Sequence, residues 1–224
     1  MWRFRHASQG VVMRTRIKIC GFTSPDTALY AALAGADAIG LVFYPPSPRH
    51  VGLKAAQAIA QALPPFVSRV ALFVDAPAEQ VREVLDTVQP DLLQFHGDET
   101  PEYCRQFERP YIKAVRVHVG LNLLQYASQY PDARGLLLDA CIPGEAGGTG
   151  TRFDWQLIPP VMSLPVILSG GLVSGNVGDA IRQVHPWAVD VSSGVESVRG
   201  VKDKEKIMRF IAEVNQLNNV QGEG

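Results

Sequence analysis

The chain has 224 residues, of which 46% are hydrophobic and 19% charged, as in a globular protein with a sizeable core. A formal net charge of −1 gives no electrostatic footprint for nucleic acid or an anionic membrane, and no apolar stretch approaches the roughly 20 residues that span a bilayer. The three cysteines, Cys20, Cys104 and Cys141, are too few and too scattered for a disulfide framework or a zinc site. We therefore expect a cytoplasmic protein without a metal.

The first predicted element is a short apolar strand, Arg16–Cys20, that ends on a thiol. Gly21 turns the chain, and Ser24 offers a capping group for a helix over Pro25–Ala34. The carboxyl ends of parallel strands are where α/β proteins place their chemistry. An isolated cysteine is more often an apolar filler, so the role of Cys20 depends on the rest of the chain.

Strand-like runs and helix-like segments alternate along the rest of the sequence. Further strands are predicted at Asp37–Phe43, Arg69–Val74, Asp91–Phe95, Tyr111–Val117, Gly135–Asp139, Pro165–Leu168 and Ala188–Val191. Further helices are predicted at Leu53–Ala62, Ala78–Val88, Pro101–Phe107, Leu121–Gln129, Asn176–Val184 and Lys202–Leu217. This pattern requires crossover connections, which make the strands parallel.

The repeat predicts an α/β protein, a single-domain eight-stranded parallel (β/α)8 TIM barrel. An open doubly wound sheet is the alternative, but no Gly-x-Gly-x-x-Gly follows the first strand. We expect residues 13–218 to form the barrel and residues 219–224 a C-terminal tail. Residues 1–12 are basic and lack the apolar segment of a signal peptide, so we expect a disordered N-terminal extension.

Glycine-rich loops follow the last three of the predicted barrel strands. Glycine lets backbone N–H groups approach an anion closely, and loops after the seventh and eighth strands of such barrels often bind phosphate. One such turn would be uninformative, but two at consecutive strand ends, each with serine, favour a phosphate site. The predicted phosphate-binding residues are Gly147, Gly148, Gly170, Gly171, Ser193 and Gly194.

Asp139 ends the sixth strand after three leucines. Partial desolvation favours its protonated form, which suits a general acid, although a turn-capping aspartate is an equal reading in isolation. Cys20 and Asp139 would stand across the barrel mouth from each other. That separation suits a base on one face of a sugar and an acid on the other.

Polar side chains also follow the second and fourth strands. Arg49 lies in a proline-stiffened loop and offers a planar fork for a carboxylate, although most loop arginines are simply solvated. Gln94 and His96 stand at alternate positions, so both could face the barrel mouth. His96 is either an acid–base group or a structural histidine, and Asp190 is expected to orient the last loop.

These motifs, in this order and spacing, resemble the phosphoribosylanthranilate isomerase family of tryptophan biosynthesis. The resemblance is carried by residues 18–21, 40–43, 47–49, 94–99, 138–140, 147–150, 153–155, 168–172 and 190–196. It implies an Amadori rearrangement of a phosphoribosyl arylamine, without a cofactor, with Cys20 as general base and Asp139 as general acid. It also implies that Arg49 holds the anthranilate carboxylate. From their positions on the fourth strand, we predict Gln94 and His96 as further substrate-binding residues.

A cysteine base must act as a thiolate, and nearby cations can lower a thiol pKa. Lys18 would face the same side as Cys20 if the first strand is regular. The partner is expected to be a small phosphosugar, and the assembly a monomer or a homodimer.

Other functions stay open. An indole-glycerol-phosphate synthase would need a catalytic lysine, for which Lys113 is the nearest candidate, and a ribulose-phosphate epimerase would need aspartates and metal-binding histidines that are missing. A barrel that only binds phosphosugars is a third reading. The related isomerisation of histidine biosynthesis would favour an aspartate where Cys20 stands.

Overall fold

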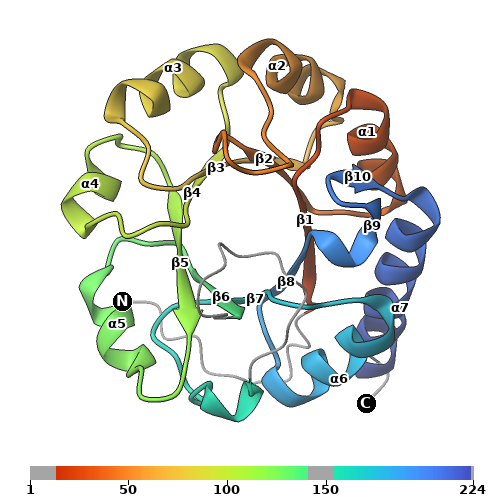
Figure 1. Cartoon of the computed structure of the whole chain (residues 1–224). Helices are drawn as coiled ribbons and strands as arrows, with labels where there is room; N and C mark the ends of the chain where they lie inside the picture. Colours follow the sequence, from red (N-terminus) through yellow and green to blue (C-terminus); the bar gives the residue numbers. More distant parts are fainter. Residues whose placement is uncertain (1–13, 141–153, 223–224) are drawn as a thin grey trace.

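Eight parallel strands form a closed ring in the computed structural model, which describes residues 14–140 and 154–222 (Figure 1). The strands are β1 Arg16–Cys20, β2 Ala38–Val42, β3 Ser68–Phe73, β4 Leu92–Phe95, β5 Tyr111–Val117, β6 Leu136–Ala140, β7 Val166–Leu168 and β8 Ala188–Val191. The helices are α1 Pro25–Ala34, α2 Leu53–Ala62, α3 Ala78–Val88, α4 Pro101–Arg105, α5 Leu123–Gln129, α6 Ser174–Val184 and α7 Lys204–Gly222. The predicted extension 1–12, Cys141, Gly147 and Gly148 lie outside the described residues.

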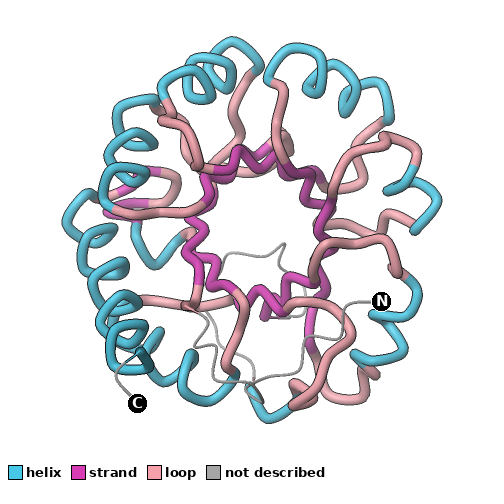
Figure 2. The backbone as a smooth tube through the Cα atoms, turned by 180° about the vertical axis from the view of Figure 1, so that it is seen from behind, coloured by secondary structure: helices cyan, strands magenta, loops and turns pink. Residues whose placement is uncertain are grey.

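The ring closes where β1 pairs in parallel with β8, with Lys18 opposite Asp190. Each strand therefore has a neighbour on both sides, and the sheet has no exposed edge. Seen from behind, the helices surround the strands as an outer layer (Figure 2). The predicted (β/α)8 barrel is confirmed.

The segment after β8 differs from the prediction. A short helical turn, η2 Ser193–Val195, leads into an antiparallel hairpin of β9 Glu196–Val198 and β10 Val201–Lys202. Helix α7 begins at Lys204 rather than Lys202 because Asp203 Oδ1 accepts a hydrogen bond from the Lys206 amide, at 3.0 Å, and so caps the first turn. The helix continues to Gly222, through residues assigned to a tail, since the sequence offers no helix breaker before that glycine.

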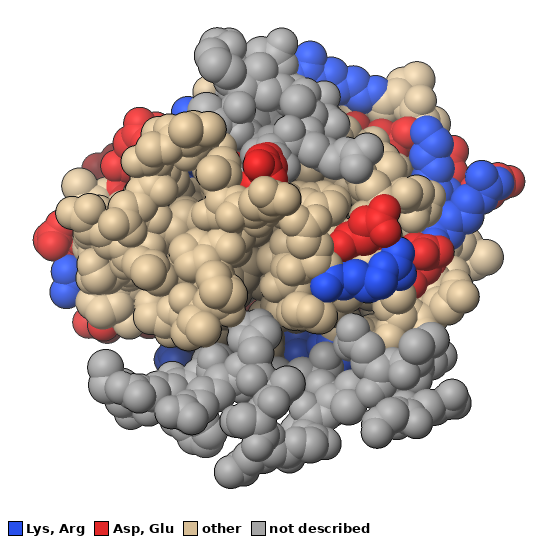
Figure 3. Space-filling view, turned by 90° about the horizontal axis from the view of Figure 1, so that it is seen from below, with Lys and Arg blue, Asp and Glu red and all other residues tan. Residues whose placement is uncertain are grey.

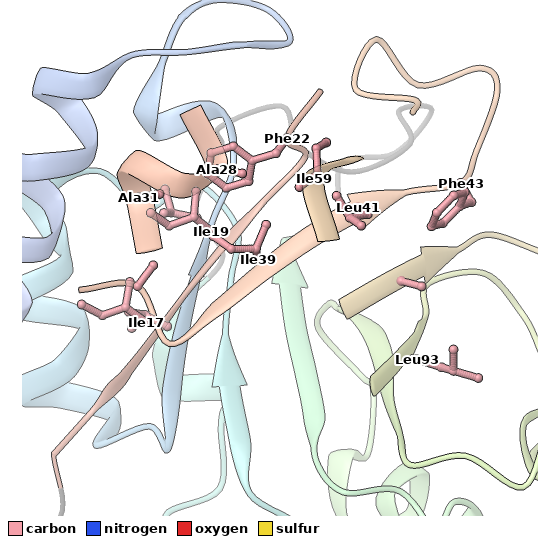
Figure 4. Close-up of a cluster of buried hydrophobic side chains, with 14 of the residues drawn as sticks. Ile17, Ile19, Phe22, Ala28, Ala31, Ile39, Leu41, Phe43, Ile59 and Leu93 are labelled. Atoms are coloured by element: carbon pink, nitrogen blue, oxygen red, sulfur yellow. The ribbon is translucent and has the colours of Figure 1, made fainter. Parts of the chain in front are cut away.

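Alternate residues of each strand face outward and pack under the helices. On β1, Ile17 and Ile19 are buried, and they lie against Ala28 and Ala31 of α1 (Figure 4). Alanine at these helix positions lets α1 approach the sheet closely. Burying each isoleucine contributes about 1.5–3 kcal/mol, so this outer layer carries much of the stability.

An aromatic cluster fills the outer core beside β4. The Phe95 ring lies 5.8 Å, between centroids, from each of Tyr103, Phe107 and Tyr111, and 6.3 Å from Phe73. Phe95 itself is fully buried. These contacts join β3, β4, β5 and α4 in one packed unit.

Inward-facing residues divide the barrel interior into two layers. One layer is apolar and consists of Ile112, Ala114, Leu137, Ile167 and Ala188. The layer toward the carboxyl ends of the strands carries Lys18, Gln94 and Asp190, which are buried and polar. The interior is therefore a packed core below a polar floor, not an open pore.

On the outer side of the barrel shown in Figure 3, acidic and basic side chains lie close together, next to a broad uncharged area. Of the helices in the described residues, none has the length and apolar character needed to cross a membrane.

Replacing Phe95 by alanine should lower the free energy of unfolding by about 3–5 kcal/mol, because it removes a buried ring and leaves a cavity. Phe66→Ala is the matched control, since Phe66 is 103% exposed and its loss should change stability by no more than about 0.5 kcal/mol. Urea unfolding followed by tryptophan fluorescence measures both variants. Equal destabilisation by the two substitutions would contradict the assignment of the core.

Candidate active site

A cavity opens at the carboxyl ends of the barrel strands, where the sequence predicts the chemistry. The predicted site residues that line it are Cys20, Arg49, Gln94, His96, Asp139, Gly170, Gly171 and Ser193. Of the other predicted residues, Gly194 is not among the lining residues. The fold thus brings Cys20 and Asp139, from β1 and β6, to one cavity.

Lys18, Cys20 and Asp190 form one group on the cavity floor. Lys18 Nζ donates a hydrogen bond to Asp190 Oδ1 at 2.8 Å, across the β1–β8 seam. Lys18 and Cys20 are two positions apart on β1, so they face the same side, and the positive charge of Lys18 acts on the Cys20 thiol. Gly40 on β2 makes room for the sulfur, because a Cβ there would lie 2.7 Å from Cys20 Sγ.

The charge state of this group is set by burial and pairing together. Burial raises the pKa of the Cys20 thiol, and the charges of Lys18 and Lys202 oppose that rise without cancelling it. Burial also works against the charge of Lys18, but Asp190 and Cys20 outweigh it and raise the Lys18 pKa. Nearby cations do lower the thiol pKa, as the sequence suggested they can, but desolvation is the larger effect and keeps the pKa above its ordinary value.

A chain of hydrogen bonds joins β4 to β6. Gln94 Nε2 donates to His96 Nδ1 at 2.9 Å, so His96 Nε2 carries the hydrogen that faces Asp139 Oδ2 at 3.2 Å. All three side chains line the cavity, as their sequence positions predict. The arrangement fixes the direction of the Asp139 carboxyl group, and the Asp139 side chain is 7% exposed.

Arg49 reaches the cavity but already holds a carboxylate. Its Nε and Nη2 donate to the two carboxylate oxygens of Glu196, at 2.7 and 2.8 Å. Lys202 Nζ donates to the same carboxylate at 2.7 Å. Although burial opposes ionisation, these bonds lower the pKa of Glu196 to about 2. The sequence reasoning missed Glu196 and Lys202 as site residues.

Lys202 also connects this cluster to the β1 end. Its Nζ donates to the backbone oxygen of Ser192 at 3.0 Å, and Ser192 Oγ donates to the backbone oxygen of Cys20 at 2.9 Å. The loop after β8 is thereby fixed to the residue that carries the thiol.

The loops after β7 and β8 form the part of the cavity that was predicted to bind phosphate. Gly170 and Gly171 both have positive φ, and within the described residues their amides donate to no backbone acceptor. Asn176 Nδ2 donates to the Gly171 oxygen at 2.9 Å and holds this turn at the start of α6. A Cβ on Gly194 would overlap the Leu172 carbonyl oxygen, so Gly194 allows the loops after β7 and β8 to pack closely together. Gly194 itself does not line the cavity.

Lys113, the candidate lysine for a synthase, does not line the cavity. Its buried Nζ donates to Glu99 Oε2 at 3.2 Å and to the Gly97 oxygen at 2.6 Å, between β4 and the outer helices. It ties the loop after β4 to β5, so Lys113 is not placed to act as the catalytic lysine of a synthase. Cys104 is fully buried in the outer core, which fits the predicted packing role. Burial raises its pKa to about 12.

The cavity-lining residues that were not predicted as site residues include Tyr44, Arg116 and Arg199. Arg116 stands two positions after Ala114, an inward residue of β5, so the two-residue period of a strand could have placed it inside. Within residues 14–140 and 154–222, no cluster of three or more His, Cys, Asp or Glu is arranged to hold a metal ion.

Comparison with known proteins gives one consistent result. A sequence model of the family described as N-(5'phosphoribosyl)anthranilate (PRA) isomerase matches residues 17–213. A curated relative from Thiobacillus denitrificans, named N-(5'-phosphoribosyl)anthranilate isomerase, is 57% identical over 201 residues, which are 90% of this chain and 98% of that protein.

Solved structures agree with the sequence match. Phosphoribosyl anthranilate isomerase from Thermotoga maritima has a TM-score of 0.82 at 41% identity, covering 90% of this chain and 99% of that one. A second structure of such an isomerase was determined in complex with reduced 1-(o-carboxyphenylamino)-1-deoxyribulose 5-phosphate. Its TM-score is 0.77 at 37% identity, with the same coverage of 90% and 99%.

Lys18→Met should raise the pKa of the Cys20 thiol further, because it removes a lysine charge that lowers the pKa of this buried group. The pH at which Cys20 is half-alkylated by iodoacetamide should rise accordingly, as measured by mass spectrometry of the Cys20 peptide. Lys54→Met, at an exposed position of α2, is the control and should leave the profile unchanged. An unchanged or downward-shifted profile for Lys18→Met would contradict the proposed electrostatics.

Proposed function

Because this chain belongs to the N-(5'-phosphoribosyl)anthranilate isomerase family, we propose that it converts N-(5'-phosphoribosyl)anthranilate to 1-(2-carboxyphenylamino)-1-deoxyribulose 5-phosphate, a step of tryptophan biosynthesis. The observation that carries the proposal is the shared cavity of Cys20 and Asp139, which has anion-binding groups at its rim. Such a cavity can hold a sugar between an acid and a base.

In the first step Asp139, as the carboxylic acid, donates its proton to the ring oxygen of the furanose. The bond between C1 and that oxygen breaks, and the nitrogen lone pair forms the iminium. The hydrogen bond from His96 orients the Asp139 carboxyl group toward the substrate. The aryl nitrogen accepts the positive charge, so this step needs no electrophilic cofactor.

In the second step the Cys20 thiolate removes the proton from C2. The electron pair of the C–H bond moves to form the enolamine and neutralises the iminium, and tautomerisation then gives the ketone at C2. A neighbouring cation stabilises a thiolate, so formation of the iminium beside Cys20 adds to the effect of Lys18. The raised thiol pKa makes the fraction of active base increase with pH.

The substrate carries two anionic groups that the cavity can hold apart. We assign the phosphate to the amides of Gly170 and Gly171 and to Ser193, with Gly147 and Gly148 as predicted further donors. We assign the anthranilate carboxylate to Arg49. The buried Gln94 Oε1, which has no hydrogen-bond partner in the described part of the chain, can accept a bond from a ribose hydroxyl.

The proposed chemistry also bears on the cellular compartment and the oligomeric state of the protein. A base that is a reduced thiol favours a reducing compartment, and we propose the cytoplasm. All the assigned groups belong to one chain, so a monomer and a homodimer would each carry complete sites.

Cys20→Ser and Asp139→Asn should each lower kcat by about 10²–10⁴-fold, because each removes a proton-transfer group, while both variants should still bind the reduced product analogue. The loss of substrate fluorescence measures turnover, with substrate generated in the assay. Cys104→Ala and Asp179→Asn serve as controls away from the cavity and should keep the wild-type kcat.

Two results would contradict this account in different ways. A Cys20→Ser enzyme with near wild-type kcat would remove Cys20 from the role of base. A wild-type protein that binds the analogue but never turns over the substrate would support a barrel that only binds phosphosugars.

A further inference from the structure

Glu196 is a buried carboxylate beside the cavity that accepts four hydrogen bonds from described residues, yet the proposed chemistry does not use it. Its side chain is 3% exposed and accepts hydrogen bonds from Arg49 Nε and Nη2, from Lys202 Nζ and from the Gly200 amide, the last at 3.0 Å. Charge-assisted bonds of this kind are short and directional. Glu196 therefore determines where the Arg49 guanidinium points.

The β9–β10 hairpin positions the Glu196 carboxylate beside Arg49. Glu196 begins β9, and Lys202, its partner in the antiparallel register, ends β10. The hairpin turn contacts the Arg49 loop directly, because a Cβ on Gly200 would lie 2.7 Å from the Pro48 oxygen. Figure 1 places the hairpin between α1 and α7, and its turn residue Arg199 lines the cavity.

The stem of Arg49 is held from the opposite side. A Cβ on Gly21 would lie 2.6 Å from Arg49 Cδ, so the arginine packs against the residue that follows Cys20. The two bonds to Glu196 use Nε and Nη2, and Nη1 takes part in neither. Because a guanidinium has five N–H donors in a rigid plane, the remaining ones can bind a second carboxylate in a fixed direction.

The charges of the cluster require an anion. Arg49 and Lys202 are cations that share the single carboxylate of Glu196, whereas Lys18 is matched by Asp190. Cys20 also interacts with Lys202, and burial raises the pKa of its thiol. Among the described residues, the cluster of Arg49, Lys202 and Glu196 therefore has two cations for one carboxylate, and burial of an unmatched charge is costly.

We propose that Glu196, held by Lys202, is a positioning residue that orients Arg49 to receive the aryl carboxylate of the substrate, and so sets the preference for arylamines that carry one. The inference rests on the proposed function, since it specifies how that substrate is recognised. The alternative is that Glu196 only fastens the hairpin to the barrel. The two roles differ in one respect: a fastening role affects every substrate equally.

The test compares Glu196→Gln with the wild type on two substrates, N-(5'-phosphoribosyl)anthranilate and the matched N-(5'-phosphoribosyl)aniline, which lacks the carboxylate. Losing a charge-assisted orientation should lower kcat/KM for the anthranilate substrate about 10-fold or more, mainly through KM. The aniline substrate should change less than about twofold, because it makes no bond to Arg49. In an Arg49→Met background, Glu196→Gln should leave the ratio of the two kcat/KM values unchanged.

Glu99→Gln is the matched structural control, because it also breaks a buried Lys–Glu pair but lies away from Arg49. Its ratio of kcat/KM values for the two substrates should stay at the wild-type value even if both fall. If Glu196→Gln does not fold, Glu196→Asp keeps the charge, withdraws it by one methylene and should move the ratio in the same direction.

An active wild type with an unchanged ratio in the foldable Glu196 variant would overturn the positioning role and leave the proposed function standing. A wild type that turns over neither substrate would overturn the proposed function, and the positioning role with it.

Discussion

The closure of the barrel at the β1–β8 seam is the constraint on which the site depends. The register that places Lys18 opposite Asp190 also fixes Cys20 two positions further on, inside the barrel mouth. A shift of one residue in this register would turn Lys18 and Cys20 outward and bring Ile17 and Ile19 into the cavity. The buried Lys18–Asp190 pair favours the observed register, because either charge alone in that interior would be costly.

Burial and charge act against each other throughout the site. Desolvation keeps Cys20 protonated in the free protein, whereas Lys18 and Lys202 lower the cost of removing that proton. Arg49 and Lys202 both form ion pairs with Glu196, so among the described residues this cluster has more positive than negative charge. An anionic group of the substrate would balance this positive charge, and a transient iminium would stabilise the Cys20 thiolate. Substrate binding would thus favour activation of the base.

The sequence is sufficient to predict the helices and strands whose bounds depend on local patterns. The bounds of β1, α1, α2, α3 and β5 agree with the prediction, because prolines, glycines and hydrophobic periodicity act within a few residues. The expected cap from Ser24 is wrong, since its side chain makes no capping hydrogen bond at the start of α1. The bond between Arg49 and Glu196 joins residues 147 positions apart, and no local pattern contains it. The pairing of Lys113 with Glu99 and the dominance of desolvation at Cys20 likewise depend on tertiary packing. The Cys20 and Asp139 pair was found because strand ends can be read locally and parallel strands place those ends together.

The central claim is that Cys20 and Asp139 act on opposite sides of one bound phosphosugar. A crystal structure of this protein with reduced 1-(o-carboxyphenylamino)-1-deoxyribulose 5-phosphate tests it most directly. The account predicts Cys20 Sγ in contact with C2, Asp139 on the far side of the sugar chain, the phosphate at Gly170 and Gly171, and the aryl carboxylate at Arg49. A bound ligand with either catalytic side chain turned out of the cavity, or with its two anionic ends exchanged, would contradict it.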